Sequence, residues 1–197
     1  LAQLDPVTRR RLEDGDWDVE EEGLLFQPQW FPIVREAPHH GRHIRYWDFA
    51  STEVQTNQRG TQINDPDWTV GTRMAAYDGQ YWVEDMRRGR LTPKGVEDLV
   101  RQTAAMDGTR VEIWIEQEPG SSGVKVIDDY QRRVLQGYTV HGLRSTGSKT
   151  ERARPVSSAA EAGNVFLVGG AWNSAFLEEV PLFGQPGPSF SAAMRSP

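Results

Sequence analysis

The chain has 197 residues, 37% of them hydrophobic and 25% charged, so it is long enough to bury a full core within one domain. It contains no cysteine, which excludes disulfides and metal sites built from thiolates. No apolar run approaches the length of a membrane span and no signal-peptide pattern opens the chain, so we expect no membrane partner.

The formal net charge of −6 is unfavourable for binding nucleic acid, but it is unevenly distributed. Residues 1–40 hold nine acids and four arginines, whereas residues 41–197 hold nineteen acids and eighteen basic residues. The second part is therefore nearly neutral and contains local basic clusters such as Arg87, Arg88 and Arg90. Such clusters could contact a DNA backbone, which needs positive charge and no sequence code, or could form a solvated turn.

The first 40 residues are predicted to form a connector and an arm. A short helix is expected over 4–15, where Asp5 is the cap and Pro6 the first helical residue, and a charged connector follows. The apolar stretches 24–26 and 30–32 predict an extended arm that packs on another surface.

From residue 41 the pattern becomes regular. Strands are expected over 42–50, 68–77 and 81–86, and Asp78-Gly79 is typical of the hairpin turn between the last two. The later elements expected are a helix from 93 to 107, a strand over 111–116, a helix with Ile127, Tyr130 and Val134 on one face, a strand over 138–143, a helix around 156–162, a strand over 165–168 and an amphipathic turn over 172–182.

This order of elements indicates an α/β fold. Placing the strand over 42–50 beside the strand over 111–116 gives a ribonuclease H-like mixed sheet, in which three antiparallel strands precede parallel strands and helices flank both. The domain is expected to span residues 41–183. The same placement brings Asp48 and Glu116 to neighbouring strand ends.

Asp48 and Glu116 each end an apolar strand and precede a loop of small residues. Carboxylates are costly beside apolar strand residues unless something pairs with them. Two of them from separate strands suit a hard divalent cation such as Mg²⁺ or Mn²⁺, although each could simply end its strand and face water. The pattern predicts a metal-dependent nuclease in which Asp48 bridges two cations and Glu116 binds one of them.

The sequence leaves more than one role possible for several further residues. Lys149 either holds a scissile phosphate or a carboxylate ligand, or is an exposed loop lysine. Glu118 either supports the metal site or is exposed in its loop. Glu112 is expected to pair with an arginine rather than bind metal, and His39, His40 and His43 are expected to be surface residues.

Six segments resemble, in chain order, the C-terminal nuclease domain of tailed-phage terminase large subunits, which are DNA-packaging motors. The resemblance implies an endonuclease that cuts double-stranded DNA by a two-metal mechanism in the cytoplasm of the infected bacterial host. It also implies three partners: the ATPase domain of the same subunit, the portal and the small terminase subunit. The segments are 12–17, 45–48, 115–121, 149–155, 162–165 and 172–177.

Two other functions compete with this interpretation. One is a non-catalytic module that docks on DNA or on the motor while keeping a degenerate ribonuclease H-like fold. The other is a different ribonuclease H-like nuclease, such as a junction resolvase, which segments 12–17 and 172–177 argue against. A phosphate-binding loop is not expected either. The closest match, 120–125, has the wrong glycine spacing and is read as a strand-to-helix turn.

The chain departs from the family pattern near its C-terminus. A third acidic cluster, typically His-Asp-Asp, is expected soon after 183–187, but Pro188-Ser189-Phe190-Ser191 stands there instead. Glu118, Glu178 and Glu179 remain as possible third acids. We therefore expect at most one well-occupied metal near Asp48, very weak activity, and a flexible tail over 184–197.

Overall fold

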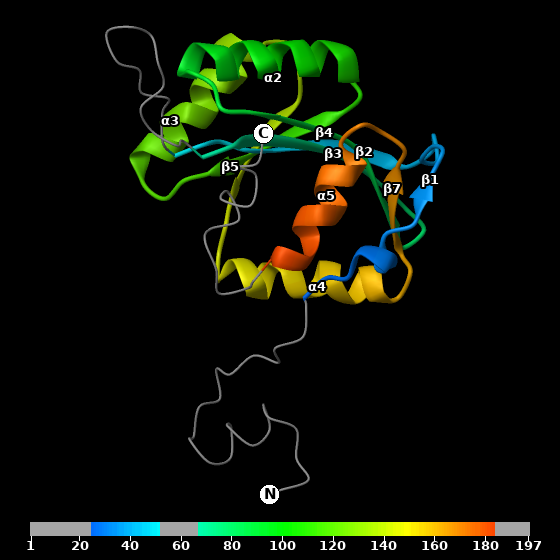
Figure 1. Cartoon of the computed structure of the whole chain (residues 1–197). Helices are drawn as coiled ribbons and strands as arrows, with labels where there is room; N and C mark the ends of the chain where they lie inside the picture. Colours follow the sequence, from blue (N-terminus) through cyan, green and yellow to red (C-terminus); the bar gives the residue numbers. More distant parts are fainter. Residues whose placement is uncertain (1–24, 52–66, 184–197) are drawn as a thin grey trace, which may run out of the picture.

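A computed structural model describes residues 25–51 and 67–183 of the chain; the helix expected over 4–15 and the tail expected over 184–197 lie outside the described residues. Figure 1 shows a central sheet with α2 and α3 on one face and α4 and α5 on the other. The strands are β1 (Ile33–Val34), β2 (Arg42–Asp48), β3 (Thr69–Tyr77), β4 (Gln80–Gly89), β5 (Glu112–Gln117), β6 (Val140–Arg144) and β7 (Val165–Val168). The helices are α2 (Pro93–Asp107), α3 (Ser121–Asp129), which continues into the π-helical turn Tyr130–Val134, α4 (Lys149–Glu161) and α5 (Asn173–Glu179), with 3-10 turns at Pro28–Trp30 and Val180–Leu182.

The seven strands form one mixed sheet in the order β1-β7-β4-β3-β2-β5-β6. Strands β2, β3 and β4 are antiparallel neighbours, and β5 lies parallel to β2 with Trp47 opposite Ile115. Strand β6 is parallel to β5, and β7 is parallel to β4. The predicted ribonuclease H-like arrangement is therefore confirmed, including the pairing of the first long strand with the strand near Glu116.

The arm ahead of β2 packs into the domain. Phe26 and Phe31 are buried against Val165, Leu167 and Val180, on the face of the sheet that α4 and α5 cover. The arm also supplies β1, a two-residue strand on the edge beside β7 that the alternation of apolar residues did not predict. No helix in the two described ranges has the length and apolar character needed to cross a bilayer.

The start of α4 differs from the prediction. The helix expected around 156–162 begins at Lys149, and Pro155 lies inside it. The missed signal is a capping box: the Ser148 hydroxyl accepts a hydrogen bond from Glu151 N at 3.1 Å, and the Glu151 carboxylate accepts one from Ser148 N at 2.6 Å. Because this box offsets part of the cost of a helical proline, the first turn of α4 forms and carries Lys149 and Arg152.

On the face covered by α2 and α3, the core is built around Trp47, Ile113 and Ile115. The ring of Trp47 lies directly over Gly71, where an added Cβ would approach the ring to 2.5 Å. A glycine in β3 therefore makes room for the indole of β2.

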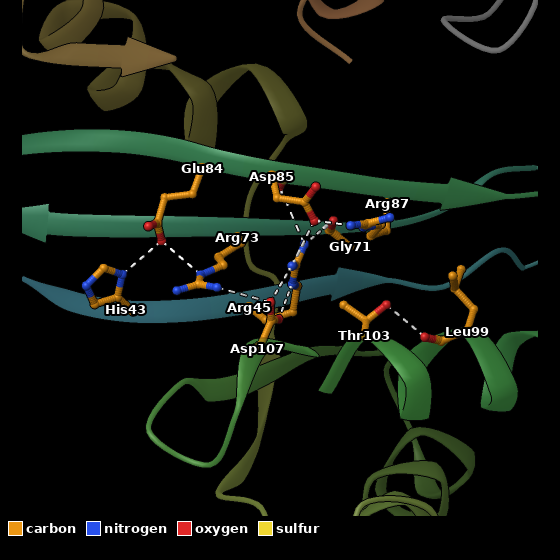
Figure 2. Close-up of polar contacts among 10 residues, drawn as sticks. All are labelled: His43, Arg45, Gly71, Arg73, Glu84, Asp85, Arg87, Leu99, Thr103 and Asp107. Carbon is orange, nitrogen blue, oxygen red and sulfur yellow. Dashed lines mark hydrogen bonds and ion pairs between the residues drawn. The ribbon is translucent and has the colours of Figure 1, made fainter. Parts of the chain in front are cut away.

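A charged network crosses the same face of the sheet (Figure 2). A register shift between Arg73 and Met74 of β3 leaves Glu84 of β4 unpaired, so that Glu84 and Asp85 both contact this network. The Arg45 guanidinium, whose side chain is 2% exposed, donates to both Asp107 oxygens at 2.8 and 2.9 Å. It also donates to Asp85 Oδ2 at 2.9 Å. The network thus ties the end of α2 to three strands.

Candidate functional site

Asp48 and Glu116 lie side by side at the ends of β2 and β5. The last paired residues of the two parallel strands are Trp47 and Ile115, so each acid is the next residue along. Since side chains alternate across a strand and Trp47 and Ile115 face the core under α2, both acids point to the opposite face. The structure therefore brings together the two carboxylates that the sequence pattern had selected.

The two acids line an open cleft of about 1470 Å³ between the sheet and the α4–α5 layer. Asp67 and Glu118 line the same cleft, and so do Lys149 and Arg152 from the first turn of α4. The wall farther from these charged residues is apolar and includes side chains of the arm and of α5. The charged end of the cleft thus combines carboxylates with two cations.

The Asp48 carboxylate makes no hydrogen bond or ion pair with another residue in 25–51 or 67–183. The concave site limits its hydration, and this, together with the charge of Glu116, raises the pKa of Asp48. The charges of Lys149 and Arg152 act in the opposite direction without cancelling the effect. Asp48 is therefore a carboxylate that no described side chain pairs with and that lies beside a second acid, which is the electrostatic setting that favours a divalent cation.

Glu116 is instead held by three side chains. Its Oε2 accepts a hydrogen bond from the Tyr46 hydroxyl at 3.2 Å, and its Oε1 accepts from Ser145 Oγ and from Arg152 Nη1, the latter at 3.3 Å. Burial acts to raise the pKa of Glu116, but the bonds from Ser145 and Tyr46 and the charge of Arg152 outweigh it, so the pKa is lowered. Burial and the nearby charge of Glu116 raise the pKa of Tyr46 to about 12, which keeps its hydroxyl a donor at neutral pH.

The three predicted arginines do not form one patch. Arg87 pairs with Asp85 at 3.0 Å and belongs to the charged network on the α2 face (Figure 2). Arg88 and Arg90 pack on the ring of Trp68, with their guanidinium carbons 5.0 and 4.6 Å from the ring centre. Of the three, Arg88 lines the cleft with the carboxylates.

The three candidates for a third acid occupy different places. Glu118 is exposed in the loop after β5 and lines the cleft. Glu179 lines it too, but pairs with Arg88 at 2.9 Å, and burial together with the charge of Glu178 raises its pKa. Glu178 is exposed and does not line the cleft. Positions 188–191, where the family cluster would fall, lie outside the described residues.

Glu112 pairs with Arg42 at 2.9 Å, as predicted. His39 and His40 are exposed, but the expectation for His43 is wrong: its side chain is 19% exposed and its Nδ1 lies 2.8 Å from Glu84 Oε2. The strand carrying His43 turns it toward the charged network. These histidines therefore do not gather at the carboxylate site.

Tyr46, Ser145 and Arg152 were not singled out from the sequence for their contacts with Glu116. Tyr46 was detectable in principle, since it lies two residues before Asp48 in the same strand and so shares its face. Asp67, whose carboxylate accepts a hydrogen bond from Ser51 at 3.0 Å, was also missed. Ser145 and Arg152 contact Glu116 only because β6 pairs with β5 and α4 follows β6 in the chain.

Among the described residues, no group of three or more His, Cys, Asp or Glu side chains is arranged to hold a metal ion. The donor chemistry nevertheless fits one hard cation: two carboxylates meet in an open cleft, and water can complete the coordination shell. Asp48 and Glu116 are the residues that would hold it.

Gly123 fixes the loop that carries Glu118. A Cβ at this position would overlap the carbonyl oxygen of Glu118, so the start of α3 approaches that backbone as only a glycine permits. We expect Gly123→Ala to lower the free energy of unfolding by about 1–3 kcal/mol, the usual cost of forced overpacking. Chemical denaturation measures it, with Ser122→Ala as the matched control because Ser122 is exposed in the same turn. A Gly123→Ala protein as stable as the Ser122→Ala protein would contradict the close approach.

Comparison with solved structures identifies similar folds. The nuclease domain of the human cytomegalovirus terminase, Mn-soaked and inhibitor-bound, matches with a TM-score of 0.58 and 13% identity over 82% of this chain and 87% of that one. The large terminase nuclease of thermophilic phage G20c with bound zinc matches with a TM-score of 0.55 and 13% identity over 85% of this chain and 92% of that one. The large terminase of a second thermophilic bacteriophage matches with a TM-score of 0.50 and 11% identity, over 81% of this chain but 36% of the terminase chain.

At these identities the structural likeness establishes the fold and not the activity. A comparison with curated proteins gave no match. Residues 45–193 match the sequence pattern of the family described as the terminase RNaseH-like domain. This match covers three quarters of the chain, begins at the strand that carries Asp48 and runs past Glu116, Lys149 and Arg152. The chain therefore belongs to the terminase RNaseH-like domain family.

Proposed function

We propose that this domain is a metal-dependent endonuclease that cuts double-stranded DNA during phage genome packaging. The observation that carries the proposal is the pair Asp48 and Glu116, which lie at adjacent parallel strand ends in an open cleft with Lys149 and Arg152 on its rim. Family membership supports it. So do the solved relatives, since the phage G20c nuclease was solved with magnesium or zinc and the cytomegalovirus nuclease with manganese.

Asp48 and Glu116 would hold Mg²⁺ or Mn²⁺ in this proposal. A bound cation supplies the charge that activates a water molecule and stabilises the leaving oxygen of a phosphodiester. Tyr46 and Ser145 orient Glu116 through neutral hydrogen bonds, which fixes the direction of its carboxylate. Lys149, exposed at the start of α4, offers a positive charge to a DNA phosphate that enters the cleft.

The number of cations follows from the available acids. Two-metal cleavage requires enough carboxylates to hold both cations against their mutual repulsion. Residues 188–191 supply none. Of the other acids that line the cleft, Asp67 accepts a hydrogen bond from Ser51, Glu179 pairs with Arg88, and Glu118 is exposed in its loop. We therefore propose one well-held cation between Asp48 and Glu116, with the second held weakly and the activity low.

A plasmid-cleavage assay tests this function. Supercoiled DNA should be nicked or linearised in Mn²⁺ or Mg²⁺, and the reaction should stop with a chelator and resume when the cation is restored. The competing possibility, a non-catalytic module that docks on DNA or on the motor, is favoured by the missing acids and predicts binding without cleavage. Intact plasmid in both cations, together with normal DNA binding, would establish the docking module instead.

The partners proposed for this domain are double-stranded DNA and the ATPase domain of the same large subunit. The large terminase of the second thermophilic bacteriophage, of which this chain matches about a third, was solved in complex with ADP and with ATP-γ-S. By family resemblance, the portal and the small terminase subunit complete the assembly. The site of action proposed is the cytoplasm of the infected bacterial cell.

DNA binding should depend on the cleft side of the sheet only. We expect Lys149→Gln to weaken the binding of a DNA duplex at low salt. It should also make the slope of log affinity against log salt shallower by about the contribution of one phosphate contact. Arg87→Gln is the matched control, because Arg87 lies on the opposite face with Asp85 and should leave both quantities unchanged. Fluorescence anisotropy across a salt series measures them. Equal losses in the two variants would show that the cleft does not define the DNA path.

A further inference from the structure

The contact between Arg152 and Glu116 has a consequence for metal loading. Arg152 Nη1 lies 3.3 Å from Glu116 Oε1 and 2.5 Å from Ser145 Oγ, which itself donates to the same carboxylate oxygen. Tyr46 occupies the other oxygen. Both oxygens of Glu116 are thus engaged, whereas the Asp48 carboxylate makes no such contact with the described residues.

A cation shared by Asp48 and Glu116 must compete with one of these donors. The hydroxyls of Tyr46 and Ser145 are neutral and can rotate to accept or donate, so they oppose a cation little. The guanidinium of Arg152 is a cation that carries only N–H donors, so it cannot accept a hydrogen bond. It repels a divalent ion at contact distance, so Arg152 is the group that metal binding has to displace.

A displaced Arg152 would stay within the cleft. Its side chain is 37% exposed, and it lies three residues after Lys149, hence on the same face of α4. Both residues line the cleft with the carboxylates. A guanidinium released there would remain in the cleft that a DNA phosphate would enter, and its planar fork suits two phosphate oxygens.

We propose that Arg152 exchanges partners during loading: it neutralises Glu116 in the metal-free protein and binds a DNA phosphate once a cation has taken the carboxylate. This exchange rests on the proposed function, because it requires the cation to sit between Asp48 and Glu116. It makes Arg152 a residue that couples the two ligands. By thermodynamic linkage, each ligand then tightens the binding of the other by the same factor.

The exchange predicts that Arg152→Gln changes the affinities for Mn²⁺ and for DNA in opposite directions. Without DNA, Mn²⁺ should bind about three- to tenfold more tightly than in the unmodified protein, because a partly exposed positive charge has been removed from the site. With Ca²⁺ present and the DNA confirmed intact, a duplex should bind about tenfold more weakly, because a charge-assisted contact is lost. Isothermal titration calorimetry and anisotropy measure the two quantities.

Two variants control this experiment. Arg152→Lys keeps the charge and should leave Mn²⁺ affinity near that of the unmodified protein. Arg132→Gln removes the same charge from an exposed site that pairs with Asp128, and should change neither affinity. If Arg152 only holds Glu116 in place, Arg152→Gln would bind Mn²⁺ more weakly or equally, and the exchange would be refuted. If the unmodified protein binds no Mn²⁺, or if Asp48→Asn leaves its binding unchanged, the proposed metal site itself fails.

Discussion

Replacing Asp48 by Asn is expected to reduce cation-dependent cleavage of duplex DNA more than about 100-fold, since changes to groups that merely support a metal ligand already cost 10–100-fold. The amide keeps the size of the side chain but removes the negative charge. Glu116 would then be left as the remaining carboxylate of the pair, and Arg152 already neutralises it. Initial rates of plasmid nicking in Mn²⁺ measure the effect, and the same variant controls for contaminating nucleases.

The same substitution should not destabilise the fold. The pKa of Asp48 is raised in the folded protein, so the folded state disfavours its charged form relative to the unfolded chain. Near neutral pH, removing that charge should therefore leave the free energy of unfolding unchanged or increase it. A functional group that the fold holds at a cost is a common compromise in active sites.

Glu118→Gln is the matched control for this experiment. Glu118 lines the same cleft from an exposed loop and should give nearly unmodified rates if it binds no cation. An equal loss in Glu118→Gln would assign it as the third ligand and contradict the proposal of a single well-held cation. Robust cleavage by Asp48→Asn would exclude the Asp48–Glu116 site.

The sheet was predictable because its signals are local. Apolar strands, the Asp78-Gly79 turn and the Thr92-Pro93 helix start all lie within a few residues of the elements they specify. The elements β3, α2, β5 and β7 begin and end within one residue of the expected positions, whereas β4 runs three residues further than expected. The start of α4 was missed because the capping box of Ser148 and Glu151 was not recognised in the polar stretch ahead of the expected helix. The helix continues through Pro155, which lies seven residues after the cap.

The partners of the site were less predictable because they depend on pairing between distant strands. Asp48 and Glu116 were predicted together because both lie at the ends of strands that the topology makes neighbours. Nothing local to Ser145 or Arg152 indicates Glu116, since their contacts depend on β6 pairing with β5. The division of Arg87 from Arg88 follows from strand alternation, which places successive residues on opposite faces.

The charged network under α2 leads to the largest effect expected on stability. Arg45→Met should lower the free energy of unfolding by about 3–5 kcal/mol, the usual cost of removing one partner from a buried ion pair. The loss is large because Asp107, whose side chain is 7% exposed, then keeps Arg73 at 3.3 Å as its one charged partner among the described residues. Methionine preserves most of the packing of the strand, so the loss reports charge and not volume.

Two further variants separate charge from packing. Arg73→Met should cost less, because the Arg73 side chain is 26% exposed and water can replace part of its contacts. Combining Arg45→Met with Asp107→Leu should recover much of the loss, since replacing a buried charge pair by apolar residues is often neutral. Chemical denaturation of the unmodified protein, Arg45→Met, Asp107→Leu and the double variant completes a double-mutant cycle. A loss below about 1 kcal/mol for Arg45→Met, as for a surface pair, would show that the network contributes little to folding. Cleavage rates well below the unfolding transition should remain unchanged, because Arg45 and Asp48 point to opposite faces of β2.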